Sequence, residues 1–276
     1  MNLDNSSIPA PSTGSPLLPA AGRLRLLRSR TGDPASAAAA LASREWTIAA
    51  RVLKSEAGSC VLSGRLNGLD VVVKCHRLVG IRAVLARVTG ATRLLRQWHG
   101  GETLAASGFA TPDLLLLFRG RDAGRGIVET LVCERAAGPT LLQVMAKRAG
   151  PIGTTSEHAL ADQAGRLVRD LHAAGLRNRD LKASNLIVTS SGLSQIDTVG
   201  IRRGRADNSG VAEMLMRLVV EPIGVGCPPR RSLRWRAARS ALGEYPPKHQ
   251  VRLLWRRVEA LLQAHGDPTP KVNPLH

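Results

Sequence analysis

Alternation of apolar and polar residues predicts a small antiparallel sheet in the first half of the chain. Five runs have this strand-like period: 47–54, 60–66, 69–76, 114–118 and 126–134. Asn67 and Gly68 separate the second run from the third, and an Asn-Gly pair between apolar runs is a strong hairpin signal. We therefore expect antiparallel strands joined by tight turns.

The second half of the chain is predicted to be mainly helical. Helices are expected at 156–174, 211–219, 233–242 and 250–264, with Pro-Pro pairs at 228–229 and 246–247 as interruptions. Upstream of the strands, Asp33 and Pro34 form the cap and first position of an alanine-rich helix that ends near Arg44. The order of the elements predicts an α+β chain.

These elements divide the chain into five segments. They are a disordered tail over 1–22, a basic and alanine-rich helical extension over 23–45, a β-rich lobe over 46–135, a helical lobe over 136–265 and a C-terminal tail over 266–276. The first segment is assigned as disordered because four prolines lie among its serines.

The composition of the chain predicts an anionic binding partner. Lysine and arginine number 39 against 21 acidic residues, for a formal charge of +18, and only six of the 39 are lysines. Such a charge implies nucleic acid, an anionic membrane surface, or a phosphorylated lipid or sugar. With seven Phe, Trp and Tyr in 276 residues, the chain has few aromatic rings on which bases could stack, so we do not expect nucleic acid as the partner. Many arginines can equally be solvated side chains without a partner.

Cysteine spacing and hydropathy suggest the compartment. The four cysteines form no C-x-x-C pair, and we expect reduced, buried thiols and a cytoplasmic setting. Residues 1–18 are polar and rich in proline and serine, unlike a signal peptide, and no apolar run reaches the roughly 18 residues of a membrane span. Membrane contact is therefore expected to be peripheral. No His or Cys spacing typical of zinc is present.

The residues with the clearest chemistry lie between 178 and 200. Asp180, Lys182 and Asn185 share one short loop, and Asp197 follows the next predicted hairpin. Phosphoryl transfer from ATP needs a carboxylate to accept the proton of the attacking hydroxyl, and oxygen ligands for Mg²⁺. Asp180 suits the first role, Asn185 and Asp197 suit the second, and Lys182 can stabilise the transferred phosphoryl group. Each aspartate alone would be an ordinary turn residue, but the set predicts a phosphotransfer site.

This pattern resembles a known superfamily. The Asp-Leu-Lys-x-Ser-Asn run at 180–185 and the Ile-Asp-x-x-Gly run at 196–200 resemble the catalytic and metal-binding loops of protein-kinase-like enzymes. The stretch from Val71 to Gly108 is similar to the lipopolysaccharide core kinases, which phosphorylate Kdo or heptose. The residues that carry this likeness are Val-Val-Val-Lys at 71–74, Arg-Gln-Trp at 96–98 and Ala-Ala-Ser-Gly-Phe-Ala-Thr-Pro at 105–112.

The resemblance covers roughly residues 46–260 and implies a two-lobed protein-kinase-like fold. Its N-lobe would be a small antiparallel β-sheet with a helix, and its C-lobe mainly helical. Lys74 would bind the α- and β-phosphates of ATP, and Glu134 would begin the hinge whose backbone binds adenine. Gln97 stands where the superfamily has a glutamate that pairs with the lysine. Glu102 is the other candidate, if the Gly-Gly pair before it distorts the helix.

Several positions depart from the superfamily pattern. The segment at 54–59, in place of a glycine-rich phosphate-covering loop, holds a single glycine. Asn178 replaces a histidine, Thr198 replaces a phenylalanine, and His172 is expected to pack rather than carry protons. A basic amphipathic pattern over 81–95 suits either an anionic lipid surface or a packed helix with a solvated arginine face.

Three functions remain open from the sequence. The favoured hypothesis is an ATP- and Mg²⁺-dependent kinase that phosphorylates a hydroxyl of a lipid-linked, anionic sugar at the inner face of the membrane. Its arginine-rich C-terminal third would hold the acceptor, and the lack of a long Ala-Pro-Glu activation segment disfavours a peptide substrate. The alternatives are a small atypical Ser/Thr protein kinase and a nucleotide-binding pseudokinase. The oligomeric state is not predicted.

Overall fold

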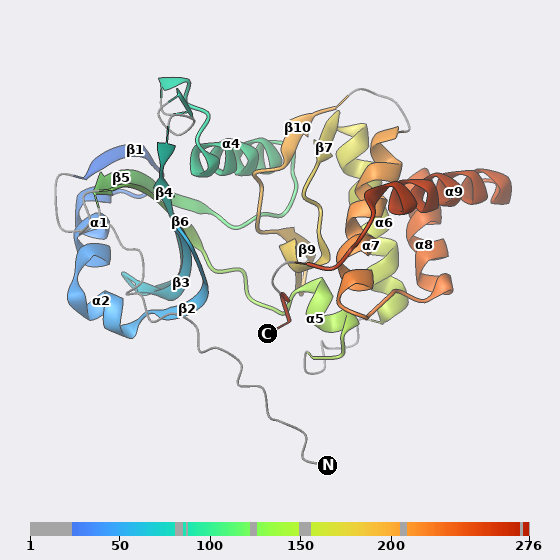
Figure 1. Cartoon of the computed structure of the whole chain (residues 1–276), viewed down its shortest axis with the longest axis horizontal. Coiled ribbons are helices and arrows are strands. Elements are labelled where there is room, and N and C mark those ends of the chain that lie inside the picture. The colour runs from blue at the N-terminus through green and yellow to red at the C-terminus, as the bar shows by residue number, and fades with distance from the viewer. Residues whose placement is uncertain are drawn as a thin grey trace, which may run out of the picture.

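The computed structural model describes residues 24–80, 85, 86, 88–121, 126–148, 156–204, 209–270 and 273–275. These residues form a β-rich lobe and a helical lobe (Figure 1). The tail predicted over 1–22 lies outside them, as do positions 81–84 and 87 of the basic helix predicted over 81–95.

Six strands of the described residues form one antiparallel sheet in the order β1-β5-β6-β4-β3-β2. They are β1 (Arg25–Ser29), β2 (Arg51–Glu56), β3 (Ser59–Leu66), β4 (Leu69–Leu78), β5 (Leu114–Arg121) and β6 (Ile127–Glu134). The hairpin predicted at Asn67 and Gly68 is confirmed, and both residues have the positive φ that such a turn requires, 50° and 84°. Val71, Val73 and Cys75 alternate into the core, as their period predicts.

The start of the chain differs from the prediction in two places. Residues 25–29, expected in a helical extension, form β1 and pair with β5 at the edge of the sheet. Residues 47–49, expected in a strand, belong to helix α2 (Arg44–Ala49), which Ser43 caps by accepting from the Trp46 N–H. Trp46 is buried against the sheet and its Nε1 donates to the Arg65 carbonyl at 3.0 Å. Burial of this indole outweighs the local strand pattern.

Helix α1 (Pro34–Ala42) confirms the predicted cap, because the Asp33 side chain accepts from the Ser36 N–H. Helix α4 (Arg93–Ala106) lies against the sheet with Leu94, Trp98 and Leu104 buried. In Figure 1 it lies between the sheet and the helical lobe. The β-rich lobe therefore has one long helix at its interface with the other lobe.

The helical lobe contains the four predicted helices. They are α6 (Glu157–Ala173), α7 (Ser209–Gly224), α8 (Arg231–Leu242) and α9 (Lys248–His265), and a short helix α5 (Leu141–Met145) precedes them. Two short strand pairs lie beside them: β7 (Leu176–Asn178) with β10 (Ile201–Arg203), and β8 (Leu186–Thr189) with β9 (Gly192–Gln195). Leu171, Leu181 and Met214 are fully buried where helices and strands meet. This core fixes the loops that carry the polar motifs.

The segment predicted as a C-terminal tail packs on the helical lobe. Leu275 contacts its apolar core, and the Leu275 carbonyl accepts from Arg148 at 2.8 Å. Cys60, Cys75 and Cys133 are buried and unlinked, as predicted, and burial raises the pKa of the Cys75 thiol to about 12. Among the helices of the described residues, none is both long and apolar enough to span a bilayer.

Candidate active site

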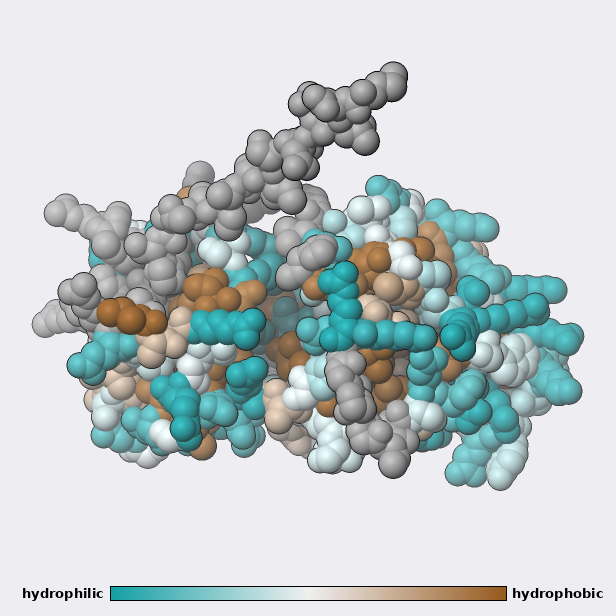
Figure 2. Space-filling view, turned by 90° about the horizontal axis from the view of Figure 1, so that it is seen from below, coloured by the Kyte–Doolittle hydropathy of each residue, from teal (hydrophilic) through white to brown (hydrophobic). Residues whose placement is uncertain are grey.

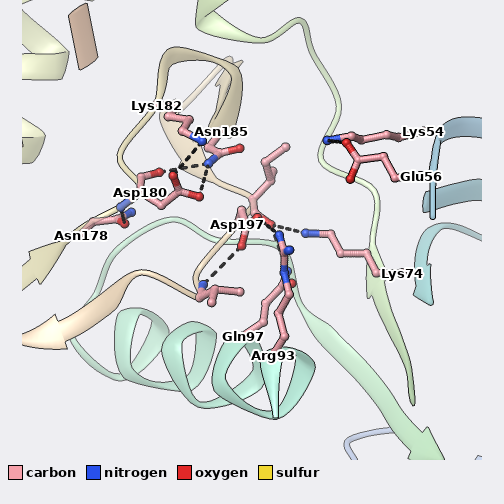
Figure 3. A network of polar contacts seen from close by, with 12 residues as sticks. Lys54, Glu56, Lys74, Arg93, Gln97, Asn178, Asp180, Lys182, Asn185 and Asp197 are labelled. Atoms are coloured by element: carbon pink, nitrogen blue, oxygen red, sulfur yellow. Dashed lines mark hydrogen bonds and ion pairs between the residues drawn. The ribbon is translucent and has the colours of Figure 1, made fainter. Parts of the chain in front are cut away.

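The predicted site residues meet where the two lobes face each other (Figure 3). Strand β7 leads into the loop that holds Asp180 and Lys182, and a 3-10 turn (Ala183–Asn185) follows. The β8–β9 hairpin then returns the chain to Asp197. Asp197 lies between the Asp180 loop and Lys74, which extends from β4 of the other lobe.

Asp180 is held among polar partners and remains accessible. Its Oδ1 lies 3.0 Å from the Lys182 Nζ. The Asn185 Nδ2 donates to the Asp180 carbonyl at 3.0 Å and to its Oδ2 at 3.4 Å. Since about a third of the Asp180 side chain is exposed, at 34%, a hydroxyl group can reach this carboxylate.

Asn178 fixes the conformation of the Asp180 loop. This buried residue accepts from the Asp180 N–H at 2.9 Å through Oδ1, and its Nδ2 donates to the Gln195 Oε1 at 3.0 Å. A Cβ on Gly200 would lie 2.6 Å from the Asn178 Oδ1 and 2.7 Å from the Asp180 nitrogen, so only glycine fits there. Asn178 is therefore more than a neutral replacement for histidine, because it links the Asp180 loop to β9.

Asn185 and Asp197 offer oxygen atoms suited to Mg²⁺. The Asp197 Oδ1 accepts from the Val199 N–H at 3.3 Å, and its Oδ2 lies 3.9 Å from an Arg93 nitrogen. Among the described residues, the Asn185 Oδ1 has no hydrogen-bond partner, since the amide nitrogen makes the contacts with Asp180. No described group of three or more His, Cys, Asp or Glu could hold a metal. A cation here would take its other ligands from phosphates and water, which fits Mg²⁺.

Lys74 and Gln97 converge on one carbonyl next to Asp197. The Lys74 Nζ donates to the Ile196 carbonyl at 3.1 Å, and the Gln97 Nε2 donates to the same oxygen at 3.3 Å. The structure thus brings Lys74 next to Asp197, and Lys74 and Gln97 contact the same oxygen rather than each other. Gln97 is buried and reaches this carbonyl from α4.

The alternative pairing of Lys74 with Glu102 is wrong. Glu102 lies 3.4 Å from Arg30 and 3.3 Å from His99, on an exposed face of α4. Helix α4 runs unbroken through the glycine pair, so a residue five positions after Gln97 points about 140° away from it.

The glycine pair instead allows close packing. A Cβ on Gly100 would lie 2.0 Å from the Thr198 carbonyl oxygen, and one on Gly101 would lie 2.8 Å from a Leu114 methyl group. The Thr198 hydroxyl donates to the Gln97 carbonyl at 2.6 Å. Thr198 therefore attaches the segment that carries Asp197 directly to α4.

Glu221 is a site residue that sequence reasoning missed. It is buried in α7, where its Oε2 accepts from the Ser184 N–H at 2.8 Å and its Oε1 accepts from the Ser184 hydroxyl at 2.7 Å. Ser184 precedes Asn185, so this carboxylate fixes the turn that presents the amide. A buried acid at the end of an apolar helix is the signal that could have identified it.

Several groups of the predicted hinge and of the strands at the β2–β3 turn already have partners within the protein. The N–H groups of Glu134 and Arg135 already donate to the carbonyls of Asp113 and Asp70, at 2.8 and 2.9 Å. Adenine at this hinge would therefore use other backbone groups than these two N–H groups. The β2–β3 turn is short, and Lys54 pairs with Glu56 at 2.9 Å beside it.

A separate apolar cavity of about 340 Å³ lies within the helical lobe. Leu141, Leu215 and Trp255 are among its walls, whereas neither Asp180 nor Asp197 lines it. This cavity is therefore separate from the residues that meet between the lobes.

This architecture is a protein-kinase-like fold, and the chain is similar to known kinases. The model of the lipopolysaccharide kinase (Kdo/WaaP) family matches residues 77–201. A solved structure of WaaP in complex with acyl carrier protein is similar over 78% of this chain and 85% of that chain, with 22% identity and a TM-score of 0.50. The predicted resemblance to the lipopolysaccharide kinases and the two-lobed α+β fold are confirmed.

Two further likenesses are to bacterial kinases. The serine/threonine-protein kinase PknA of Mycobacterium tuberculosis and of Mycobacterium bovis is 35% identical over 80 residues. That stretch is 29% of this chain and spans 18% of those relatives. The M. tuberculosis PknI kinase domain aligns with 76% of this chain and 94% of that one, at 15% identity and a TM-score of 0.40. The family whose model matches residues 77–201 is one of lipopolysaccharide kinases.

Proposed function

We propose that the chain is an ATP-dependent kinase that transfers the γ-phosphoryl group to a hydroxyl of a lipid-linked sugar. The observation that carries this proposal is the convergence of the two lobes on one segment. Lys74 of the β-rich lobe donates to the Ile196 carbonyl, and the adjoining Asp197 faces the loop of Asp180 and Asn185. These are the groups that phosphoryl transfer requires, on two sides of one cleft.

Each group has a role in this proposal. Lys74 binds the α- and β-phosphates, and Asn185 and Asp197 would hold Mg²⁺, which when bound neutralises charge on the phosphates. Asp180 orients the acceptor hydroxyl and accepts its proton. Lys182, 3.0 Å from the Asp180 carboxylate, stabilises the charge that develops on the transferred group.

The basic surface of the helical lobe favours an anionic acceptor. Residues 230–265 contain nine Lys and Arg against two Glu, a difference of +7. Hydrophilic side chains cover the end of the molecule that α8 and α9 form (Figure 2). We also propose that the protein is cytoplasmic and that this surface contacts the anionic inner face of the membrane.

The short connection after Asp197 supports a sugar acceptor over a peptide. Eleven residues separate Asp197 from the first residue of α7. A peptide-binding activation segment would need a longer chain. The match to PknA favours the alternative of a small Ser/Thr protein kinase, and the two acceptors are distinguished by their products.

The test is transfer from labelled ATP to Kdo-containing lipopolysaccharide, to a serine peptide and to the chain itself. We expect label in the glycolipid for the wild type and none for Asp180→Ala. Asp170→Ala, an exposed aspartate of the same lobe that pairs with its neighbour Arg169, should behave like the wild type. Label confined to peptide or protein would support the protein-kinase alternative. No transfer to any acceptor, with ATP still bound, would support a pseudokinase.

A further inference from the structure

Arg93 brings a second positive charge to the cleft beside Lys74. It is the first residue of α4, one helical turn before Gln97, so both side chains lie on the same helix face. Its Nη2 lies 3.9 Å from the Asp197 Oδ2, and Figure 3 shows the side chain directed from α4 towards Asp197. Because 53% of the side chain is exposed, solvent and small ligands can reach Arg93.

The contact between Arg93 and Asp197 leaves the guanidinium available to a ligand. A separation of 3.9 Å is longer than a hydrogen bond, so the N–H donors of Arg93 are not all occupied by the carboxylate. Glu56 of β2 lies near enough to be affected. The pKa of Glu56 is lowered mainly by its hydrogen bond from Lys54 and to a lesser degree by the charge of Arg93. The charge of Arg93 therefore acts on Glu56 of β2 as well as on Asp197.

The charge on this helix face is the reverse of what the superfamily pattern implies. A glutamate at position 97 would neutralise Lys74, but α4 supplies the neutral Gln97 and the cation of Arg93. Among the described side chains, no carboxylate lies within 4.0 Å of the Lys74 ammonium. The β2–β3 turn holds a single glycine, so side chains limit how closely its backbone can approach phosphates. A second cation would compensate for that limit.

We propose that Arg93 binds the phosphates of the nucleotide together with Lys74. This inference rests on the proposed kinase function. The guanidinium presents a planar fork of donors that matches phosphate oxygens, which an ammonium cannot reproduce. Arg93 is thereby a nucleotide-binding residue supplied by the helix that elsewhere in the superfamily supplies an acid.

Equilibrium binding of Mg-ATP, Mg-ADP and adenosine to the full chain tests the role of Arg93. Arg93→Gln should weaken ATP binding about 10-fold or more, as expected for loss of a charge-assisted hydrogen bond. Adenosine, which lacks phosphates, should bind equally to both forms. Arg93→Lys should give an intermediate loss for ATP. Arg28→Gln removes an exposed arginine of β1 whose guanidinium contacts the adjacent Leu27 carbonyl, and it should leave all three affinities unchanged.

The outcomes separate this inference from the function on which it rests. ATP binding by Arg93→Gln as tight as by the wild type would overturn the role of Arg93 while leaving the kinase proposal intact. Equal losses for ATP and adenosine would also overturn it, because they would indicate a structural defect in α4. Failure of the wild type to bind ATP would overturn the kinase proposal, and the role of Arg93 with it.

Discussion

Replacement of Gly100 by alanine sets helix propensity against tertiary packing. Alanine is favoured over glycine inside a helix by about 1 kcal/mol, so propensity alone predicts a more stable protein. A Cβ at this position would lie 2.0 Å from the Thr198 carbonyl oxygen, whereas real Cβ contacts essentially never fall below 3.0 Å. The backbone of α4 or of Thr198 must therefore move by about 1 Å.

The movement has a cost in stability and a larger one in activity. Overpacking of this kind costs about 1–3 kcal/mol, which offsets or exceeds the gain in propensity. Thr198 adjoins Asp197, and its hydroxyl donates to the Gln97 carbonyl at 2.6 Å. A displacement of about 1 Å near reacting groups can reduce turnover about 100-fold. We expect a loss of transfer of that order in Gly100→Ala.

Gly101→Ala is the matched control. The new methyl group would meet the end of the Leu114 side chain at 2.8 Å, and a flexible side chain can move where a backbone carbonyl cannot. Stability from urea unfolding and transfer rates for both variants provide the measurement. A Gly100→Ala protein about 1 kcal/mol more stable than the wild type, with unchanged transfer, would refute the packing argument.

Two further predictions concern carboxylates away from the nucleotide. Glu221→Ala should lower turnover about 10-fold or more with little change in the KM for ATP, because Ser184 loses both contacts. Glu221→Gln can still accept from the Ser184 N–H and should lose less turnover. Equal turnover in the wild type and both variants would contradict a positioning role. Burial opposes ionisation of Asp162, but hydrogen bonds from Arg236 and Ser240 outweigh it and lower its pKa. Its contribution is therefore present above its ordinary value of 3.8 and lost as the pH falls through the lowered pKa. The stability deficit of Asp162→Asn should shrink in acid unfolding experiments below pH 3.8, and a constant deficit would exclude this linkage.

Local patterns were sufficient for much of the fold. The Asn67-Gly68 turn, the Asp33 cap and the apolar helices follow from local conformation and hydrophobic period, and the structure contains them all. Strand β1 could not be predicted in this way, because its arginines hide the alternation and its pairing with β5 is a long-range contact. The same holds for Trp46, whose burial against β3 depends on the whole lobe.

The candidate site was likewise predicted only in part from the sequence. Spacing along the chain was enough to select Asp180, Lys182, Asn185 and Asp197, which the structure brings to one cleft with Lys74. Residues that support them were not predicted, since Glu221 and Arg93 reach the loops from helices distant in sequence. The choice between Gln97 and Glu102 also required the structure, because it depended on whether α4 remained regular through its glycines.

The magnesium dependence of ATP binding by the wild type and by Asp197→Ala tests the central claim most directly. If Asp197 and Lys74 surround one nucleotide, Mg²⁺ should tighten ATP binding by the wild type and should have little effect on the variant, whose fold should be intact. An equal effect of Mg²⁺ on both proteins would contradict the placement of the metal and nucleotide between the lobes.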